Sequence, residues 1–212
     1  MSPKIILFFS LFIVQISHTQ VVSFQKNLEE AVFFLDQSKT QDQYTVAFSK
    51  MESLYKMDPS QWLPAYYATL IKARMSIKKM GNPDILADEA LAWLMKTKAL
   101  HNSDEVGCVE SFAYTAKMAV SPTFRWNSYD KKIKNPLAFA LGLNKNNPRI
   151  YTLQASLQYR MPGWFGGGCK SALPLAQKAK LIFDAQKNDF TVMPHWGRQI
   201  INEIINGCPV LE

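Results

Sequence analysis

Residues 147–186 read NPRIYTLQASLQYRMPGWFGGGCKSALPLAQKAKLIFDAQ. An asparagine followed by a proline, as in Asn147-Pro148, is a favourable helix start, because asparagine caps the first turn and proline is tolerated there. The run from 161 to 168 contains one proline and four glycines, which end that helix in a turn. A second helix then begins at Cys169. The stretch therefore predicts two antiparallel helices joined by a short turn, which is a helical hairpin.

This hairpin pattern recurs along the chain. Helix-start signals stand at Ser60, Ser103 and Asn147, which are 43 and 44 residues apart. In the last copy, small residues spaced four and three apart allow two helices to approach closely, namely Ala172, Ala176 and Ala179. Stacked hairpins of this kind form an α-solenoid. We therefore predict an all-α, tetratricopeptide-like right-handed superhelix with three hairpins, or four if the N-terminal helices form another.

The rest of the chain shows helical periodicity and no alternating pattern typical of strands. The longest irregular stretch is expected at 121–135, after a stop at Ser121-Pro122, with a short helix from Asn135-Pro136 to about 143. A final helix is expected over about 196–207. No linker divides the chain, so we expect residues 20–212 to form one domain.

The N-terminus resembles a targeting segment. A short basic start precedes an apolar run over residues 5–16, and small residues suitable for cleavage follow. That run is 12 residues long, whereas a membrane-spanning helix needs about 20 apolar residues. We therefore expect a signal peptide over residues 1–19, export to the periplasm or the extracellular space, and no stable membrane insertion after its removal.

The formal net charge is +7, but the lysines and arginines are scattered. The densest cluster is Lys131-Lys132-Ile133-Lys134, and a solvated helix face explains it better than a nucleic-acid site. No nucleic-acid partner is predicted.

The chain has three cysteines and no closely spaced pair typical of a redox or zinc site. Cys169 opens one predicted helix and Cys208 closes the next, so antiparallel packing would bring them to the same end. A disulfide between them and two separate buried thiols are both open possibilities. Cys108, inside a helical pattern, is expected to be a small core residue.

The sequence contains no recognisable catalytic motif or phosphate-binding loop. Outside the expected signal peptide the only histidines are His101 and His195, too few for a histidine-based metal site. The glycines at 166–168 could cradle an anion with their N–H groups, but a tight turn explains them better. We predict a protein that is not an enzyme, with no catalytic residue, metal or cofactor.

The candidate binding residues lie in or beside the expected loops, where aromatic side chains can anchor a partner or line a groove. They are Arg125, Trp126, Tyr129, Trp164, Phe165 and Trp196. The alternative is that the rings cover the ends of helical hairpins, and that Arg125 stacks locally rather than pairing with a partner's carboxylate.

Residues 140–149, ALGLNKNNPR, resemble the junction between tetratricopeptide repeats. The helix start at 62–67, the FGGG turn at 165–168 and the closing helix from Trp196 to Cys208 are similar to small exported tetratricopeptide-like proteins of Bacteroidetes-type bacteria. This resemblance covers about residues 40–208 and implies a helical-repeat fold and export. It implies no activity and no catalytic residues.

Two functions remain. The first is an exported scaffold that binds an unidentified protein or peptide on a concave surface, with 121–135 and 161–168 as rim contacts. The alternative is a small-ligand or glycan-binding protein, or an unrecognised hydrolase, that uses an aromatic-lined cavity under those loops. A pocket with convergent aromatic residues would favour the second, and an open groove the first.

Overall fold

The structure is a computed structural model that describes residues 23–186 and 191–208, and every regular element in those ranges is helical. A first helix covers residues 23–37. It is followed by α2 (Gln41–Met57), α3 (Trp62–Ile77), α4 (Pro83–Leu100), α5 (Asp104–Ala119), α6 (Pro122–Leu143), α7 (Pro148–Arg160), the 3₁₀ turn η1 (Gly163–Phe165), α8 (Cys169–Ala185) and α9 (Arg198–Gly207). The predicted all-α class is confirmed.

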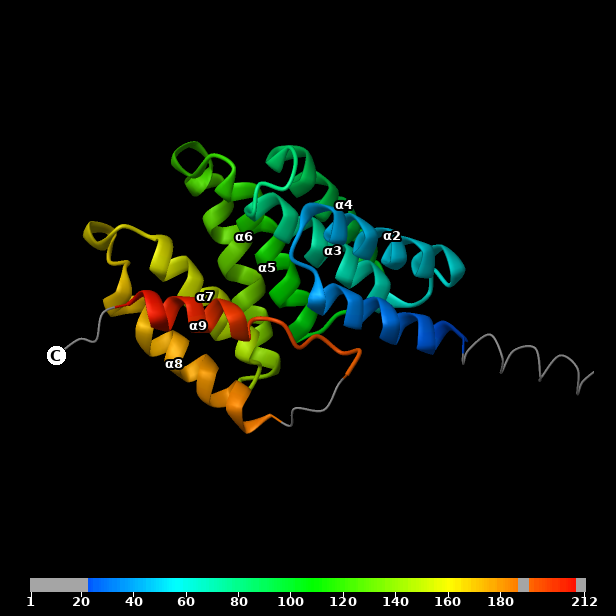
Figure 1. Ribbon diagram of the computed structural model, residues 1–212. Coiled ribbons are helices and arrows are strands. Elements are labelled where there is room, and N and C mark those ends of the chain that lie inside the picture. Colours follow the sequence, from blue (N-terminus) through cyan, green and yellow to red (C-terminus); the bar gives the residue numbers. More distant parts are fainter. Residues whose placement is uncertain (1–22, 187–190, 209–212) are drawn as a thin grey trace, which may run out of the picture.

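Neighbouring helices pack as pairs, as the hairpin pattern predicts. The closest pairs are α3 with α4, α5 with α6, and α7 with α8. Across the pairs, α3 contacts α5 and α5 contacts α7, so these three helices connect one hairpin to the next. Figure 1 shows the hairpins side by side, with α9 lying along α7 and α8.

The expected signal peptide lies outside the described residues. Within residues 23–186 and 191–208, none of the helices is both long and apolar enough to cross a bilayer.

Capping side chains are present at the starts of α2, α4, α5 and α7. The Asn82 side chain accepts from the N–H of Asp84 and Ile85, Ser103 accepts from Val106, and Asn147 accepts from Arg149. The expected cap at Ser60 is wrong, because α3 begins at Trp62 after Gln61. Ser60 instead donates to the carboxylate of Asp58, and these hydrogen bonds lower the pKa of Asp58.

Small residues allow the helices to approach closely. Ala172, Ala176 and Ala179 are fully buried in the α7–α8–α9 cluster, as predicted. On α5, a Cβ at Gly107 would lie 2.8 Å from the carbonyl oxygen of Pro136 on α6. Only glycine permits that contact, so the α5–α6 spacing depends on it.

The prediction of an irregular stretch at 121–135 is wrong. Proline disfavours a helix at the residue before it, yet α6 runs unbroken from Pro122 to Leu143 with Pro136 inside it. The buried residues Ile133, Leu137 and Ala140 lie on one face of α6, which packs mainly on α5. This packing outweighs the roughly 3 kcal/mol that an interior proline costs a helix.

Candidate functional site

An apolar groove of about 410 Å³ lies between α6, α7 and α8. We call it the outer groove. Its α6 residues recur at helical spacing and therefore face one way. Its apolar lining is Trp126, Ile133, Leu137, Ala138, Leu141, Leu157, Met161 and Leu175, and its polar lining is Asp130, Lys134, Gln154 and Gln158.

The groove exists because neighbouring hairpins diverge here. α6 packs on α5 and α7 packs on α8, whereas α6 and α7 touch at few points. Some of the apolar side chains that face this gap are therefore only partly covered, whereas Ile133 and Leu137 at its base are 2% exposed. Leu141 and Leu157 are only partly buried. Each packs against the main core and also lines the groove.

One cation stands at the rim of the outer groove. Lys134 Nζ lies 2.7 Å from a carboxylate oxygen of Asp130 and 5.9 Å from the ring centroid of Trp126. Both side chains of the ion pair reach solvent, and such exposed pairs contribute only about 0–1 kcal/mol. Lys134 is therefore free to exchange Asp130 for a ligand's carboxylate at little cost.

A second cavity, the inner cleft, has a volume of about 700 Å³ and lies on a different face of α7. Phe112, Leu153 and Trp196 give it an apolar floor, and Arg74, Lys78 and Arg160 line it with positive charge. Among the described residues, none of these three cations forms an ion pair with a carboxylate. The cleft thus combines apolar surface with unpaired cations.

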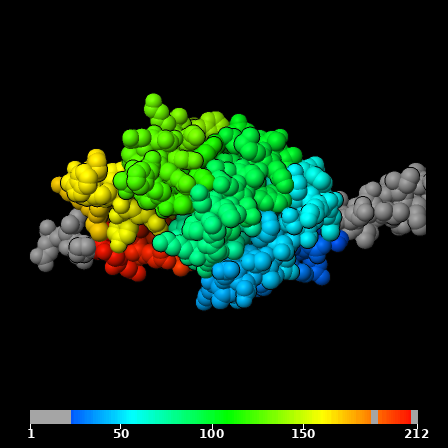
Figure 2. Space-filling view, turned by 90° about the horizontal axis from the view of Figure 1, so that it is seen from above, coloured from blue at the N-terminus to red at the C-terminus, as the bar shows by residue number. Residues whose placement is uncertain are grey.

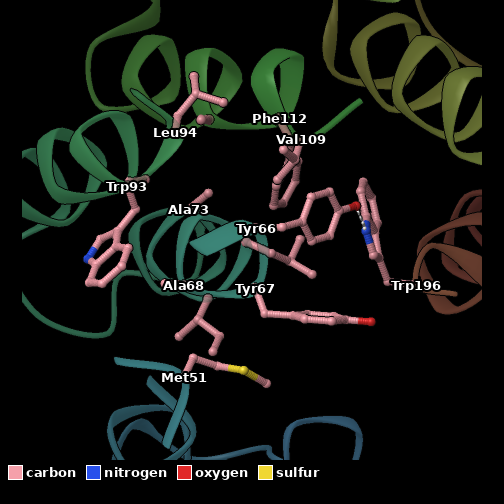
Figure 3. Packing of buried hydrophobic residues seen from close by; sticks show 14 of the residues in the cluster. Met51, Tyr66, Tyr67, Ala68, Ala73, Trp93, Leu94, Val109, Phe112 and Trp196 are labelled. Atoms are coloured by element: carbon pink, nitrogen blue, oxygen red, sulfur yellow. Dashed lines mark hydrogen bonds between the residues drawn. The ribbon is translucent and has the colours of Figure 1, made fainter. Parts of the chain in front are cut away.

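Trp196 is held rigidly in the floor of this cleft. Its Nε1 donates to the hydroxyl of Tyr66 at 2.8 Å, and its ring lies 5.4 Å from Phe112 (Figure 3). The Arg74 guanidinium lies 6.0 Å from the same ring. Trp196 is only 7% exposed, so it is a core residue as much as a cleft residue.

Residues 191–197, which we call the strap, cross the inner face before α9. The Tyr67 hydroxyl donates to the carbonyl of Val192 at 2.8 Å, and His195 Nε2 lies 2.7 Å from Asp36 on the first helix. At the end of the strap Gly197 has φ +115°, and a Cβ there would press on Phe183 at 3.1 Å. The strap therefore packs against α3 and the first helix, and this arrangement was not predicted.

We expect the contact between the strap and the first helix to stabilise the fold more at low pH than at high pH. The hydrogen bond with Asp36 raises the pKa of His195. A group whose pKa is raised by folding contributes stability that is full below its unfolded pKa, about 6.5, and is lost as the pH rises through the higher folded value. The thermal unfolding temperature of the wild type should therefore decrease as the pH is raised from about 6 to about 8. An Asp36→Asn variant with the same pH dependence would contradict this.

A buried polar network lies beside the inner cleft. Arg149 Nε donates to both oxygens of Glu105 at 2.9 and 2.7 Å, and Arg149 Nη2 makes a further bond. Asn147 Nδ2 donates to Glu105 at 2.8 Å, and the Tyr66 hydroxyl donates at 3.4 Å. Burial raises the pKa of Tyr66 well above its usual value, so its hydroxyl stays protonated. The sequence analysis did not single out Glu105 or Arg149.

Four of the six predicted binding residues lie in three separate places, and the other two make contacts elsewhere in the chain. Trp126 lines the outer groove and Trp196 the inner cleft, while the tilted rings of Trp164 and Phe165 lie 4.0 Å apart in an exposed turn. Arg125 and Tyr129 are engaged within the chain. Arg125 donates to Asp84 at 2.7 and 3.0 Å, and this bond lowers the pKa of Asp84. Tyr129 lies 6.1 Å from Tyr114.

Cys169 and Cys208 form a disulfide with their Cα atoms 5.5 Å apart, and Cys108 is a buried free thiol. The bond joins the start of α8 to the end of α9. Among the described residues, no group of three or more His, Cys, Asp or Glu side chains is placed to hold a metal ion.

The fold and the groove define an all-helical protein of packed hairpins with an apolar channel on its surface. A solved structure with a similar overall fold is the HusA haemophore from Porphyromonas gingivalis, which is 30% identical, with a TM-score of 0.75 over 86% of this chain and 90% of that chain. At this identity and coverage, the chain belongs to the same family as that haemophore. No protein-family model and no curated protein matches it. The expected resemblance to small helical proteins of Bacteroidetes is supported to that extent.

Proposed function

We propose that this protein is an exported binding protein that carries haem or a related porphyrin in the outer groove. The observation that carries the proposal is the family relationship to a haemophore, a binding protein rather than an enzyme. It favours the small-ligand alternative over a protein scaffold. The expected signal peptide over residues 1–19 supports export.

The chemistry of the outer groove suits such a ligand. Haem is a flat and largely apolar ring with carboxylate groups at one edge. The groove volume of about 410 Å³ falls within the roughly 300–1,000 Å³ typical of ligand sites. Its leucines and Trp126 offer an apolar surface to the ring, and Lys134 at the rim offers a counter-charge to a carboxylate.

The groove offers little for the iron. Among its lining residues, all of which the structure describes, there is no histidine, cysteine or tyrosine, and Met161 supplies the one sulfur. His195 lies in the inner cleft, where its ring nitrogens contact Asp36 and the carbonyl of Met193. Recognition in the outer groove would therefore rest on the ring and its carboxylates.

The test is a titration with haem and with metal-free protoporphyrin, followed by the porphyrin absorption band. Trp126→Ala should weaken binding about tenfold, because an aromatic contact contributes about 0.5–1.5 kcal/mol beyond its buried area. Lys134→Gln should weaken binding of the free acid but not of the porphyrin dimethyl ester, which lacks the charge. A wild type that binds neither porphyrin would refute the proposal.

Peptide binding in the inner cleft is the second candidate, and the unpaired Arg74, Lys78 and Arg160 are the observation that favours it. An Arg74→Gln variant in the same titration separates the two sites. It should leave porphyrin binding unchanged if the outer groove is the site. If Arg74→Gln lost porphyrin binding and Trp126→Ala kept it, the ligand would lie in the inner cleft instead.

A further inference from the structure

The turn between α7 and α8 presents two neighbouring aromatic rings to solvent. Trp164 is 81% exposed and Phe165 is 67% exposed, with ring centroids 4.0 Å apart. We call these two residues the aromatic tip. Figures 1 and 2 place this yellow segment at one end of the elongated molecule, far from α2. Exposure of two large neighbouring rings is unfavourable in water, so it calls for an explanation.

The turn that carries the tip is firmly held. Gly168 N–H donates to Gln158 at 2.8 Å, and the Ser171 hydroxyl donates to the carbonyl of Gly166 at 2.6 Å. A Cβ at Gly167 would lie 2.2 Å from the carbonyl oxygen of Met161, so glycine is required there. The disulfide at Cys169 follows immediately. The rings are therefore presented by a fixed backbone.

The segment of sequence that contains the aromatic tip is rich in positive charge. Residues 131–183 contain nine lysines and arginines and no aspartate or glutamate. Arg149 is buried against Glu105, and the others are exposed: Lys131, Lys132, Lys134, Arg160, Lys145, Lys170, Lys178 and Lys180. Only Lys134 and Lys180 of these eight pair with a carboxylate among the described residues. Lys170 and Arg160 flank the aromatic tip in sequence.

We propose that the aromatic tip docks the protein on an anionic lipid surface. Tryptophan and phenylalanine beside lysine and arginine are the residue types that settle at a membrane interface, with rings at the headgroup level and cations facing the phosphates. A protruding pair of rings enters soft lipid without a preformed pocket, whereas a protein partner would have to supply one. This is peripheral binding and needs no spanning helix.

The aromatic tip lies beside the outer groove, so docking of the tip would bring the groove close to the lipid. Met161 lines the groove, and its backbone contacts Gly167 in the turn. A groove that opens beside a lipid-bound tip can exchange apolar ligands with the membrane. The docking itself does not depend on porphyrin binding.

The test is flotation of the purified protein with vesicles of phosphatidylglycerol and phosphatidylcholine, compared with phosphatidylcholine alone. We expect binding to the anionic vesicles that falls with added salt. A Trp164→Ala, Phe165→Ala double variant should bind at least about tenfold more weakly. Because residues 5–16 are apolar, wild type and variants must carry the same N-terminus.

Phe124→Ala is the matched control, since Phe124 is 87% exposed on α6 and lies outside the tip. It should bind vesicles like the wild type. The proposal is overturned if the wild type does not bind anionic vesicles, if the tip variant binds equally well, or if Phe124→Ala loses as much. Normal porphyrin uptake by a tip variant that no longer floats would support docking independently of the proposed function.

Discussion

An Arg149→Met variant is expected to be about 3–5 kcal/mol less stable than the wild type, because it leaves a charged carboxylate buried without its partner. The side chains of Arg149 and Glu105 are only 6% and 12% exposed. With the guanidinium gone, Glu105 keeps neutral donors from Asn147 and Tyr66, which do not balance its charge. The loss should appear as a lower urea midpoint at an unchanged slope.

A double variant, Arg149→Met with Glu105→Leu, separates charge from packing. Arg149 Nη1 is buried and has no hydrogen-bond partner among the described residues, so the ion pair is not fully satisfied. Replacing a buried pair of this kind by apolar groups is often neutral or stabilising. We therefore expect the double variant to regain most of the loss. If it stayed as unstable as the single variant, packing between α5 and α7 would be the stabilising factor.

The recurrence at 43 to 44 residues explains why these side chains meet. Glu105 and Arg149 are 44 residues apart, and Asp104 and Asn147 are 43 apart. Residues one repeat apart hold equivalent places in neighbouring hairpins and therefore lie next to each other. The helix-start signals at Ser103 and Asn147 revealed this spacing in the sequence. Nothing local marked the pairing, because an acidic residue in a first helical turn is commonly solvated.

Periodicity predicted most of the helices, but it failed where distant contacts decide the structure. α6 continues through Pro136 because its buried face packs on α5. The strap has no regular pattern and is held by residues 125 to 159 positions away in sequence. Contacts at such separations leave no periodic signal.

Only part of the candidate site could be predicted from the sequence. The aromatic residues near 121–135 and 161–168 suggested a cavity only as the alternative to a partner-binding rim, and of these residues Trp126 lines the outer groove together with Met161. The sequence analysis did not single out the leucines of this groove. They become a surface groove because α6 and α7 diverge, and that divergence depends on how the hairpins stack.

Removal of the Cys169–Cys208 disulfide is expected to lower the free energy of unfolding by about 3–4 kcal/mol. The bond closes a separation of 39 residues. In the loop-entropy account, its loss gives the unfolded chain more conformations and leaves the folded contacts in place. A Cys169→Ser, Cys208→Ser variant should show this in urea unfolding, and reduction of the wild type should reproduce it.

The effect should be larger at one end of the molecule. α9 packs on α8 and α7 through Ile201 and Ile204, so without the disulfide it can detach while α3 and α5 stay packed. Hydrogen exchange should then speed up more in α9 than in α3. Cys108→Ala, which removes a buried thiol outside the disulfide, should leave α9 exchange unchanged relative to α3. Equal acceleration in α3 and α9 would mean that the disulfide acts only through the unfolded chain. In that case α9 would stay packed on α7 and α8 without the disulfide.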